Sequence, residues 1–252
     1  MAIQKTEAFV LKTQPFRSSS LIVTFFSHSF GKLRGVVKGV RREGEMRGAL
    51  YELFTHLEIL FYEKMRSDLH LVSEASIVES HDSLRTRLDT IAYASYFSEL
   101  VDFLCEVQDP HPKIFELLDF SFRFLPSVPE ARLSCLFEIA LLREIGWIPY
   151  LDACLHCHQR AFEQGYFSIS QGALFCSGCA RNVPDARVLG IEALVVLRYY
   201  GSHALEPSLK LRVAKTTENE LMKLMDRFLI FRLGAPLKSQ RFIEQIRPVL
   251  SK

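Results

Sequence analysis

The residues best suited to chemistry are four cysteines arranged in two pairs. Cys154 and Cys157 form one Cys-x-x-Cys, Cys176 and Cys179 form another, and 18 residues lie between the pairs. Two intervening residues let a tight turn direct both sulfurs toward one ion, and two such turns supply the four thiolates that suit tetrahedral zinc. The sequence therefore predicts a Zn²⁺ site whose ligands are Cys154, Cys157, Cys176 and Cys179.

This ligand set indicates a structural role for the metal. Four thiolates leave no coordination position for a catalytic water. His156 and His158 flank the first pair and are alternative ligands, and an iron–sulfur cluster is an alternative occupant. The other two cysteines, Cys105 and Cys135, fall within helical patterns, and we interpret them as small buried apolar residues.

The cysteines also bear on the expected compartment. The chain starts Met-Ala-Ile-Gln-Lys-Thr-Glu, without the apolar run of a signal peptide. It has no stretch approaching the roughly 18 uncharged apolar residues of a membrane-spanning helix. We expect a cytoplasmic protein. Thiols stay reduced in that compartment, which favours a metal site over disulfides.

A second chemical feature is a run of cations near the N-terminus. Residues 1–48 contain nine basic and three acidic side chains, a net +6 in a chain whose total is +2. Such asymmetry is typical of a basic end that meets a polyanion. Residues 32–38 have the pattern of a strand that leads into a glycine-bearing loop, where the backbone can approach a phosphate. We predict DNA phosphate contacts from Lys32, Arg34, Lys38, Arg41, Arg42 and Arg47.

Catalytic patterns are missing from the sequence. There is no P-loop, dinucleotide-binding glycine motif, His-Glu-x-x-His or nucleophile elbow, and we therefore expect a protein that is not an enzyme. Two alternatives stay open. One is a scaffold that binds only protein, its basic strand being merely solvated. The other is a zinc-assisted nuclease, against which the closed set of four ligands argues.

The elements that must position these residues change in type near residue 80. Alternating apolar residues predict strands at about 8–13, 21–26, 33–37, 57–62 and 69–78, with a short helical turn within 47–54. Five short strands describe an OB-type barrel, an open sheet being the alternative. Helical spacing follows at 84–104, 112–125, 130–145, 187–200, 218–233 and 240–250, and a hairpin is predicted between the cysteine pairs.

We therefore predict an α+β protein of two domains. Residues 1–79 would form an OB-fold β-barrel that binds DNA. Residues 80–252 would form an all-α domain with a four-cysteine zinc knuckle at about 150–183.

Several segments, in this order, carry a family resemblance. They run from Thr6-Glu-Ala-Phe-Val-Leu-Lys through Ser20-Leu-Ile-Val-Thr-Phe-Phe, Phe30-Gly-Lys-Leu, Lys38-Gly-Val-Arg-Arg, Arg47-Gly-Ala-Leu and Leu57-Glu-Ile-Leu-Phe-Tyr. Downstream are Phe137-Glu-Ile-Ala-Leu-Leu-Arg-Glu-Ile-Gly-Trp-Ile-Pro, Cys154-Leu-His-Cys and Cys176-Ser-Gly-Cys. The series resembles the bacterial RecO recombination mediators over nearly the whole chain.

The resemblance implies both activity and partners. Such proteins have an N-terminal OB-fold and a helical domain, bind single- and double-stranded DNA and anneal complementary strands. They work with the RecR protein and with the acidic C-terminal tail of the single-stranded-DNA-binding protein, and they help the RecA recombinase load onto coated strands. Zinc occurs in some members. The resemblance also implies a bacterial protein that is associated with the nucleoid when it acts. For the acidic tail, a basic-rimmed groove in the last helices is our hypothesis, resting on Arg232, Lys238, Arg241, Arg247 and Lys252.

Overall fold

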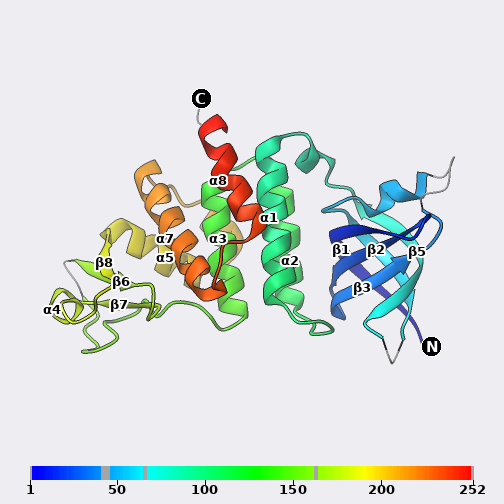
Figure 1. Cartoon of the computed structure of the whole chain (residues 1–252). Coiled ribbons are helices and arrows are strands. Elements are labelled where there is room, and N and C mark those ends of the chain that lie inside the picture. The colour runs from blue at the N-terminus through cyan, green and yellow to red at the C-terminus, as the bar shows by residue number, and fades with distance from the viewer. Residues whose placement is uncertain (1, 41–45, 65–66, 162–163, 251–252) are drawn as a thin grey trace. The chain divides into compact units, whose positions relative to one another are not determined.

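The computed structural model describes residues 2–40, 46–64, 67–161 and 164–250 (Figure 1). Its contacts divide the chain into two compact units. The first comprises Met1–Ser127 together with Ser239–Lys252, and the second comprises Val128–Lys238. Neither unit, within the described residues, has a helix long and apolar enough to cross a membrane.

The first unit contains a closed five-stranded barrel. Its strands are β1 (Ile3–Phe16), β2 (Ser20–Ser27), β3 (Gly31–Val37), β4 (His56–Tyr62) and β5 (Leu69–Glu79). They pair in the order β1-β2-β3-β5-β4 and close through β4 and β1, with only β3 and β5 parallel. The barrel is thus confirmed over the open sheet, and its form fits an OB-fold. The predicted helical turn is the 3₁₀ helix η1 (Met46–Tyr51).

The barrel buries side chains on both faces of β1. Val10 lies in the barrel core with Val23, Phe25 and Leu33, because inward and outward side chains alternate along a strand. Phe9 points the other way, and its ring centroid lies 4.7 Å from that of Phe115 on a covering helix. The apolar residues on both faces of β1 are therefore explained by the burial of both faces.

Helices begin immediately after the barrel, as the sequence predicts. The first unit contains η2 (Asp82–Arg85), α1 (Leu88–Leu104) and α2 (Pro112–Phe124), together with α8 (Lys238–Leu250) from Ser239 onward. The Glu99 carboxylate on α1 accepts a hydrogen bond of 2.8 Å from the backbone N–H of Ser239. This bond anchors the start of α8 to α1.

The second unit combines helices with a small sheet. The helices are α3 (Glu130–Glu144), α4 (Ser177–Ala180), α5 (Ile191–Ser202), α6 (Leu205–Leu209) and α7 (Lys215–Leu233). The sheet has the order β7-β6-β8, with β6 at Gly165–Ser168, β7 at Ala173–Phe175 and β8 at Ala186–Leu189. The β6–β7 pair is the hairpin predicted between the cysteine pairs.

Two helix ends follow the expected glycine chemistry. Gly146 has φ +76°, and the N–H of Trp147 donates to the carbonyl of Leu142 at 2.7 Å. A hydrogen bond from the residue after a left-handed glycine back to a carbonyl in the last helical turn is typical of a helix C-terminus. Gly234, with φ +78°, ends α7 in the same region of backbone space.

The predicted helix from Arg187 to Tyr200 is wrong over its first residues. Residues 186–189 form β8, which pairs antiparallel with β6 in a register that sets Val188 against Tyr166. The helix α5 begins only at Ile191, after Gly190. The apolar pattern of this segment is too short to separate a strand from a helix turn, and the open edge of β6 decides the outcome.

Candidate metal centre and nucleic-acid interface

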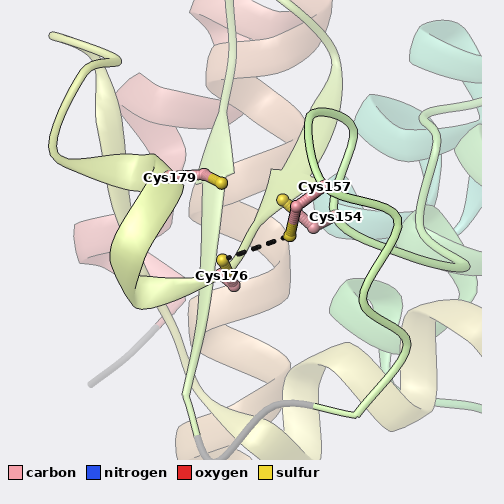
Figure 2. Close-up of side chains that lie close together, drawn as sticks. All are labelled: Cys154, Cys157, Cys176 and Cys179. Carbon is pink, nitrogen blue, oxygen red and sulfur yellow. Dashed lines mark hydrogen bonds between the residues drawn. The ribbon is translucent and has the colours of Figure 1, made fainter.

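The small sheet brings the two cysteine pairs together. Cys154 and Cys157 lie in the loop between α3 and β6, Cys176 follows β7 directly, and Cys179 lies in α4. The backbone N–H of Leu155 donates to the carbonyl of Leu174 on β7 at 2.8 Å, which ties the first loop to the hairpin. Figure 2 shows the four side chains converging from these two segments.

The four sulfurs are spaced as a shared metal ion requires. All four Sγ atoms lie within 4.8 Å of one another, and those of Cys157 and Cys176 are 3.7 Å apart. Zinc–sulfur bonds of about 2.3 Å in a tetrahedron would set the sulfurs about 3.8 Å apart. The predicted cluster is therefore formed by the cysteines that the spacing indicated, and it can hold a metal.

The site also favours the thiolate form of one ligand. Cys154 is fully buried. Although burial raises its pKa, backbone N–H groups of Cys157, Cys176 and His156 outweigh that effect and lower the pKa of Cys154 to about 6. By contrast, the thiol of Cys176 holds the pKa of Cys179 at about 12. Four negative charges in one place repel each other, so full deprotonation needs a cation among them.

The neighbouring histidines lie differently from each other. The Nδ1 atom of His156 is 3.6 Å from the Sγ of Cys179, beside the cluster. His158 is exposed and has a left-handed backbone, with φ +59°. The remaining cysteines, Cys105 and Cys135, are buried and lie outside the cluster, as predicted. Burial raises the pKa of Cys105 to about 12, which makes this thiol chemically inert at neutral pH.

The six cations predicted to contact DNA do not share one environment. Lys32 lies at the start of β3, where its Nζ donates to the backbone carbonyl of Asp102 at 2.5 Å and lies 3.5 Å from the carboxylate of the same residue. Its side chain is only 13% exposed. A phosphate at Lys32 would therefore have to displace Asp102.

This end of β3 is covered by the loop between α1 and α2. The carbonyl of Lys32 accepts a hydrogen bond from the N–H of Gln108 at 3.0 Å. Gly31 has φ +62°, and a Cβ there would lie 2.0 Å from the carbonyl oxygen of Asp109. Only glycine permits this close approach, so Gly31 allows the loop to pack against this end of β3.

Arg34 and Lys38 are placed differently from Lys32. Both are exposed, with Arg34 in the middle of β3 and Lys38 just beyond its end. Arg41 and Arg42 lie outside the described residues, and so does the side chain of Arg47, whose backbone belongs to η1. Of the described candidates, then, two present their charge to solvent.

The barrel end near Lys38 collects features that no single segment reveals. Phe16 pairs with Ser20 across the β1–β2 turn, and Leu21 pairs with Val37, so that turn and Lys38 lie at the same end. The guanidinium of Arg17 lies 5.2 Å from the centroid of the half-buried Phe16 ring. Phe25, Phe26 and Tyr51 are buried in the core and therefore cannot stack on bases.

A cavity opens on the barrel beside Lys38. It measures about 540 Å³ and lies where β5 continues past its short pairing with β3. Among the described residues its lining is mostly apolar, with one cation and one acid, and includes Val37, Lys38, Val40, Leu50, Tyr51, Leu71, Val72, Ser73, Glu74 and Ala75. Sequence patterns could not find it, because it joins segments that are distant in the chain.

The second unit has a smaller cavity with a basic rim. It measures about 200 Å³, lies between the small sheet and α7, and includes the apolar residues Phe167, Val188 and Leu224. Two acids in its lining are engaged: Asp185 accepts hydrogen bonds from Ser168 and Ser170, and Glu220 accepts one from the N–H of Gly190. The basic residues of the rim are Arg187, Lys223 and Arg227.

Comparison with protein families identifies the class to which this arrangement belongs. A family model described as "Recombination protein O N terminal" matches residues 1–81, which include the whole barrel. A second model, "Recombination protein O C terminal", matches residues 85–241, which include the cysteine cluster. Together the two models span both units.

Individual relatives agree. The chain is 31% identical to a DNA repair protein RecO of Syntrophus aciditrophicus, over 98% of this chain and 97% of that protein. It is 30% identical to one from Anaeromyxobacter, over 98% of each chain, and 28% identical to one from Bacillus mycoides, over 96% and 97%. The chain therefore belongs to the RecO family of DNA repair proteins, and the resemblance inferred from its segments is confirmed.

Proposed function

We propose that this protein is a recombination mediator that binds single- and double-stranded DNA and anneals complementary strands. In this role it would help load recombinase onto strands coated by single-stranded-DNA-binding protein. The observation that carries the proposal is that Arg34 on β3 and Lys38 just beyond its end present their charges to solvent, in a member of the RecO family.

Annealing follows from charge alone in this proposal. Cations that neutralise phosphates release condensed counterions, which gives affinity and a steep salt dependence without reading sequence. Two strands held on one cationic surface repel each other less, so their bases can pair. Arg41, Arg42 and Arg47 follow Lys38 in the sequence and are expected to add phosphate contacts. Arg17 beside Phe16 adds a cation and an aromatic ring at the end of the barrel where Lys38 lies. Lys32 would contribute to this cationic surface only if its ammonium group broke its contacts with Asp102.

The metal in this proposal is a structural Zn²⁺ ion bound by the four cysteines. Its fit rests on the spacing of the sulfurs and on the donor set, since thiolates of this number and geometry suit zinc. The ion would supply the positive charge that lets all four thiols deprotonate. It would thereby fix the loop at Cys154 to the end of the hairpin.

Two protein partners belong to the proposal. One is the RecR protein, for which we assign no surface. The other is the acidic tail of the single-stranded-DNA-binding protein, which would enter the basic-rimmed cavity beside α7. Because both acids in the lining are already hydrogen-bonded, the exposed Lys223 and Arg227 are available for carboxylates, while the apolar floor suits an apolar terminal residue.

The tail site can be separated from the groove first expected in the last helices. A fluorescent acidic peptide ending in Phe should lose affinity when Lys223 and Arg227 become Glu. The matched variant Arg241→Glu with Arg247→Glu reverses two charges on α8. If only the α8 variant weakens binding, the tail lies at the last helices, and the cavity beside α7 is the wrong site.

The decisive experiment for the proposed function is strand annealing without nucleotide. Two complementary fluorescent oligonucleotides are mixed with protein, with and without strand-coating protein. We expect acceleration that fades with salt and is reduced in Arg34→Ala with Lys38→Ala. No DNA binding at low salt by folded, zinc-loaded protein would instead favour the protein-only scaffold. Metal-dependent cleavage that Cys176→Ser abolishes without unfolding would favour the nuclease.

A further inference from the structure

A second group of metal-ligand side chains lies in the first unit, away from the cysteines. Glu79 ends β5, His81 precedes η2, and Asp119 lies on α2. Each of these residues can offer one ligand atom such that all three atoms lie within 4.8 Å of one another. The group joins the last barrel strand, the connection after it and a covering helix.

His81 is the unusual member of this group. Its side chain is 2% exposed, and its ring packs near those of Phe9 and Phe122, with centroids 6.1 and 5.7 Å away. Among the described residues its Nε2 has no hydrogen-bond partner, and its Nδ1 is 3.6 Å from the Glu79 carboxylate, beyond hydrogen-bond distance. A buried imidazole without such a partner is costly and requires an explanation.

The backbone at His81 adds to that cost. Its φ of +53° places a non-glycine residue in the left-handed region, which is uncommon and unfavourable for most side chains.

The two carboxylates complete a plausible ligand set. Glu79 is 44% exposed at its side chain, so an ion can reach the group from solvent. Asp119 is oriented by Arg123, whose guanidinium donates to one carboxylate oxygen at 2.6 Å. An outer partner of this kind commonly fixes a metal-binding carboxylate and leaves its other oxygen for the ion.

We propose that Glu79, His81 and Asp119 form a second metal site that takes a divalent cation such as Mn²⁺ or Zn²⁺. One imidazole and two carboxylates are hard to borderline ligands, unlike the four thiolates of the first site. The bound ion would give a partner to Nδ1 of His81, the ring nitrogen that faces the Glu79 carboxylate. It would also join the end of β5 to α2, where the barrel meets its covering helices.

The test uses Mn²⁺ on the full-length protein with its cysteine site already loaded with zinc. Mn²⁺ prefers carboxylate ligands to thiolates, so the cysteines do not compete. Titration followed by electron paramagnetic resonance should show one bound Mn²⁺ per chain. In Glu79→Gln and in Asp119→Asn the affinity should fall about 10-fold or more, since even the loss of an outer partner costs that much.

A matched control comes from a second histidine–carboxylate contact. His111 Nε2 lies 2.9 Å from the Asp109 carboxylate on the exposed α1–α2 loop, and Asp109→Asn should leave Mn²⁺ binding unchanged. His81→Asn removes the ring while keeping a residue that tolerates positive φ. Bound Mn²⁺ should also broaden the NMR signals of the Phe9 and Phe122 rings. Absence of bound Mn²⁺, or equal affinity in wild type and Asp119→Asn, would overturn the proposal.

Discussion

The cysteine cluster and the cationic strand β3 are both short in sequence, yet they differ in what decides their arrangement. The cysteines of the cluster come from two tight turns joined by one hairpin, so their spacing along the chain determines their spacing in space. The cations of β3 are sorted by contacts with distant residues: Asp102 engages Lys32, while Arg34 and Lys38 face solvent. A cluster of cysteines able to hold a metal can thus be predicted from local patterns, whereas a run of charges identifies only a region.

The largest effect should come from breaking the cluster. Cys157→Ser removes one thiolate and should abolish stoichiometric zinc, because structural zinc contributes on the order of 10 kcal/mol in small modules. Residues 150–183 should become protease-sensitive while the barrel stays folded, as measured by limited proteolysis and metal analysis. His158→Asn keeps the positive φ and should retain the metal. Undiminished protease resistance in metal-free Cys157→Ser would show that the cluster supports nothing.

A smaller effect is expected when a solvent-facing cation is removed. Lys38→Ala should lower the slope of log affinity against log salt by about one unit, the share of a single phosphate contact. Lys5, whose Nζ lies 2.8 Å from Glu58 on the barrel surface, provides the control, since Lys5→Ala removes an equal charge from a paired site. Equal slopes for Lys38→Ala and wild type would place DNA elsewhere.

Lys32→Met tests the cation of β3 that contacts Asp102 and does not face solvent. It should lower the free energy of unfolding by about 1–3 kcal/mol, because it removes a charged hydrogen-bond donor from Asp102. The salt slope for DNA should hardly change. Urea unfolding and salt titration of the same preparation measure both quantities. If Lys32→Met lowered the salt slope by one unit and left the stability unaltered, Lys32 would be a DNA contact after all.

The smallest expected effect is a loss of folding stability at mildly acidic pH. Burial lowers the pKa of His70 in the folded barrel despite the nearby Glu63 and Asp68, and its Nδ1 accepts a hydrogen bond from the N–H of Lys64 at 3.2 Å. At neutral pH both states are uncharged at this ring. As the pH falls through about 6.5, the unfolded state binds a proton first, and stability is lost. Urea unfolding at neutral and mildly acidic pH should show this loss, and His70→Gln should reduce it.

How far the fold could be predicted depended on how local each feature is. The five barrel strands, the 3₁₀ turn and the hairpin between the cysteines follow from alternation and turn residues. The barrel closes because β1 pairs with β4, with Ile3 opposite Tyr62. The periodicity of apolar residues does not predict which distant strands pair. The strand β8 was missed because an open sheet edge, not its own sequence, makes it a strand.

The features of the candidate sites were also predictable only where they are local in sequence. The cysteines were identified completely, whereas the cavity beside Lys38 and the group around His81 join segments far apart in the chain. The contact between Lys32 and Asp102 spans 70 residues. Its only signal in the sequence is the glycine at position 31, which allows the covering loop to approach.

The hydrogen bond from Ser239 to Glu99 has a consequence for synthesis. It links residues 140 positions apart, and it places α8 in the same compact unit as the barrel. The second unit is continuous in the chain and is complete once residue 238 has been translated, whereas the first, although begun earlier, must wait for α8. The nascent protein would therefore finish its two units in the reverse of the order in which it starts them, leaving α1 to await its late partner on the ribosome.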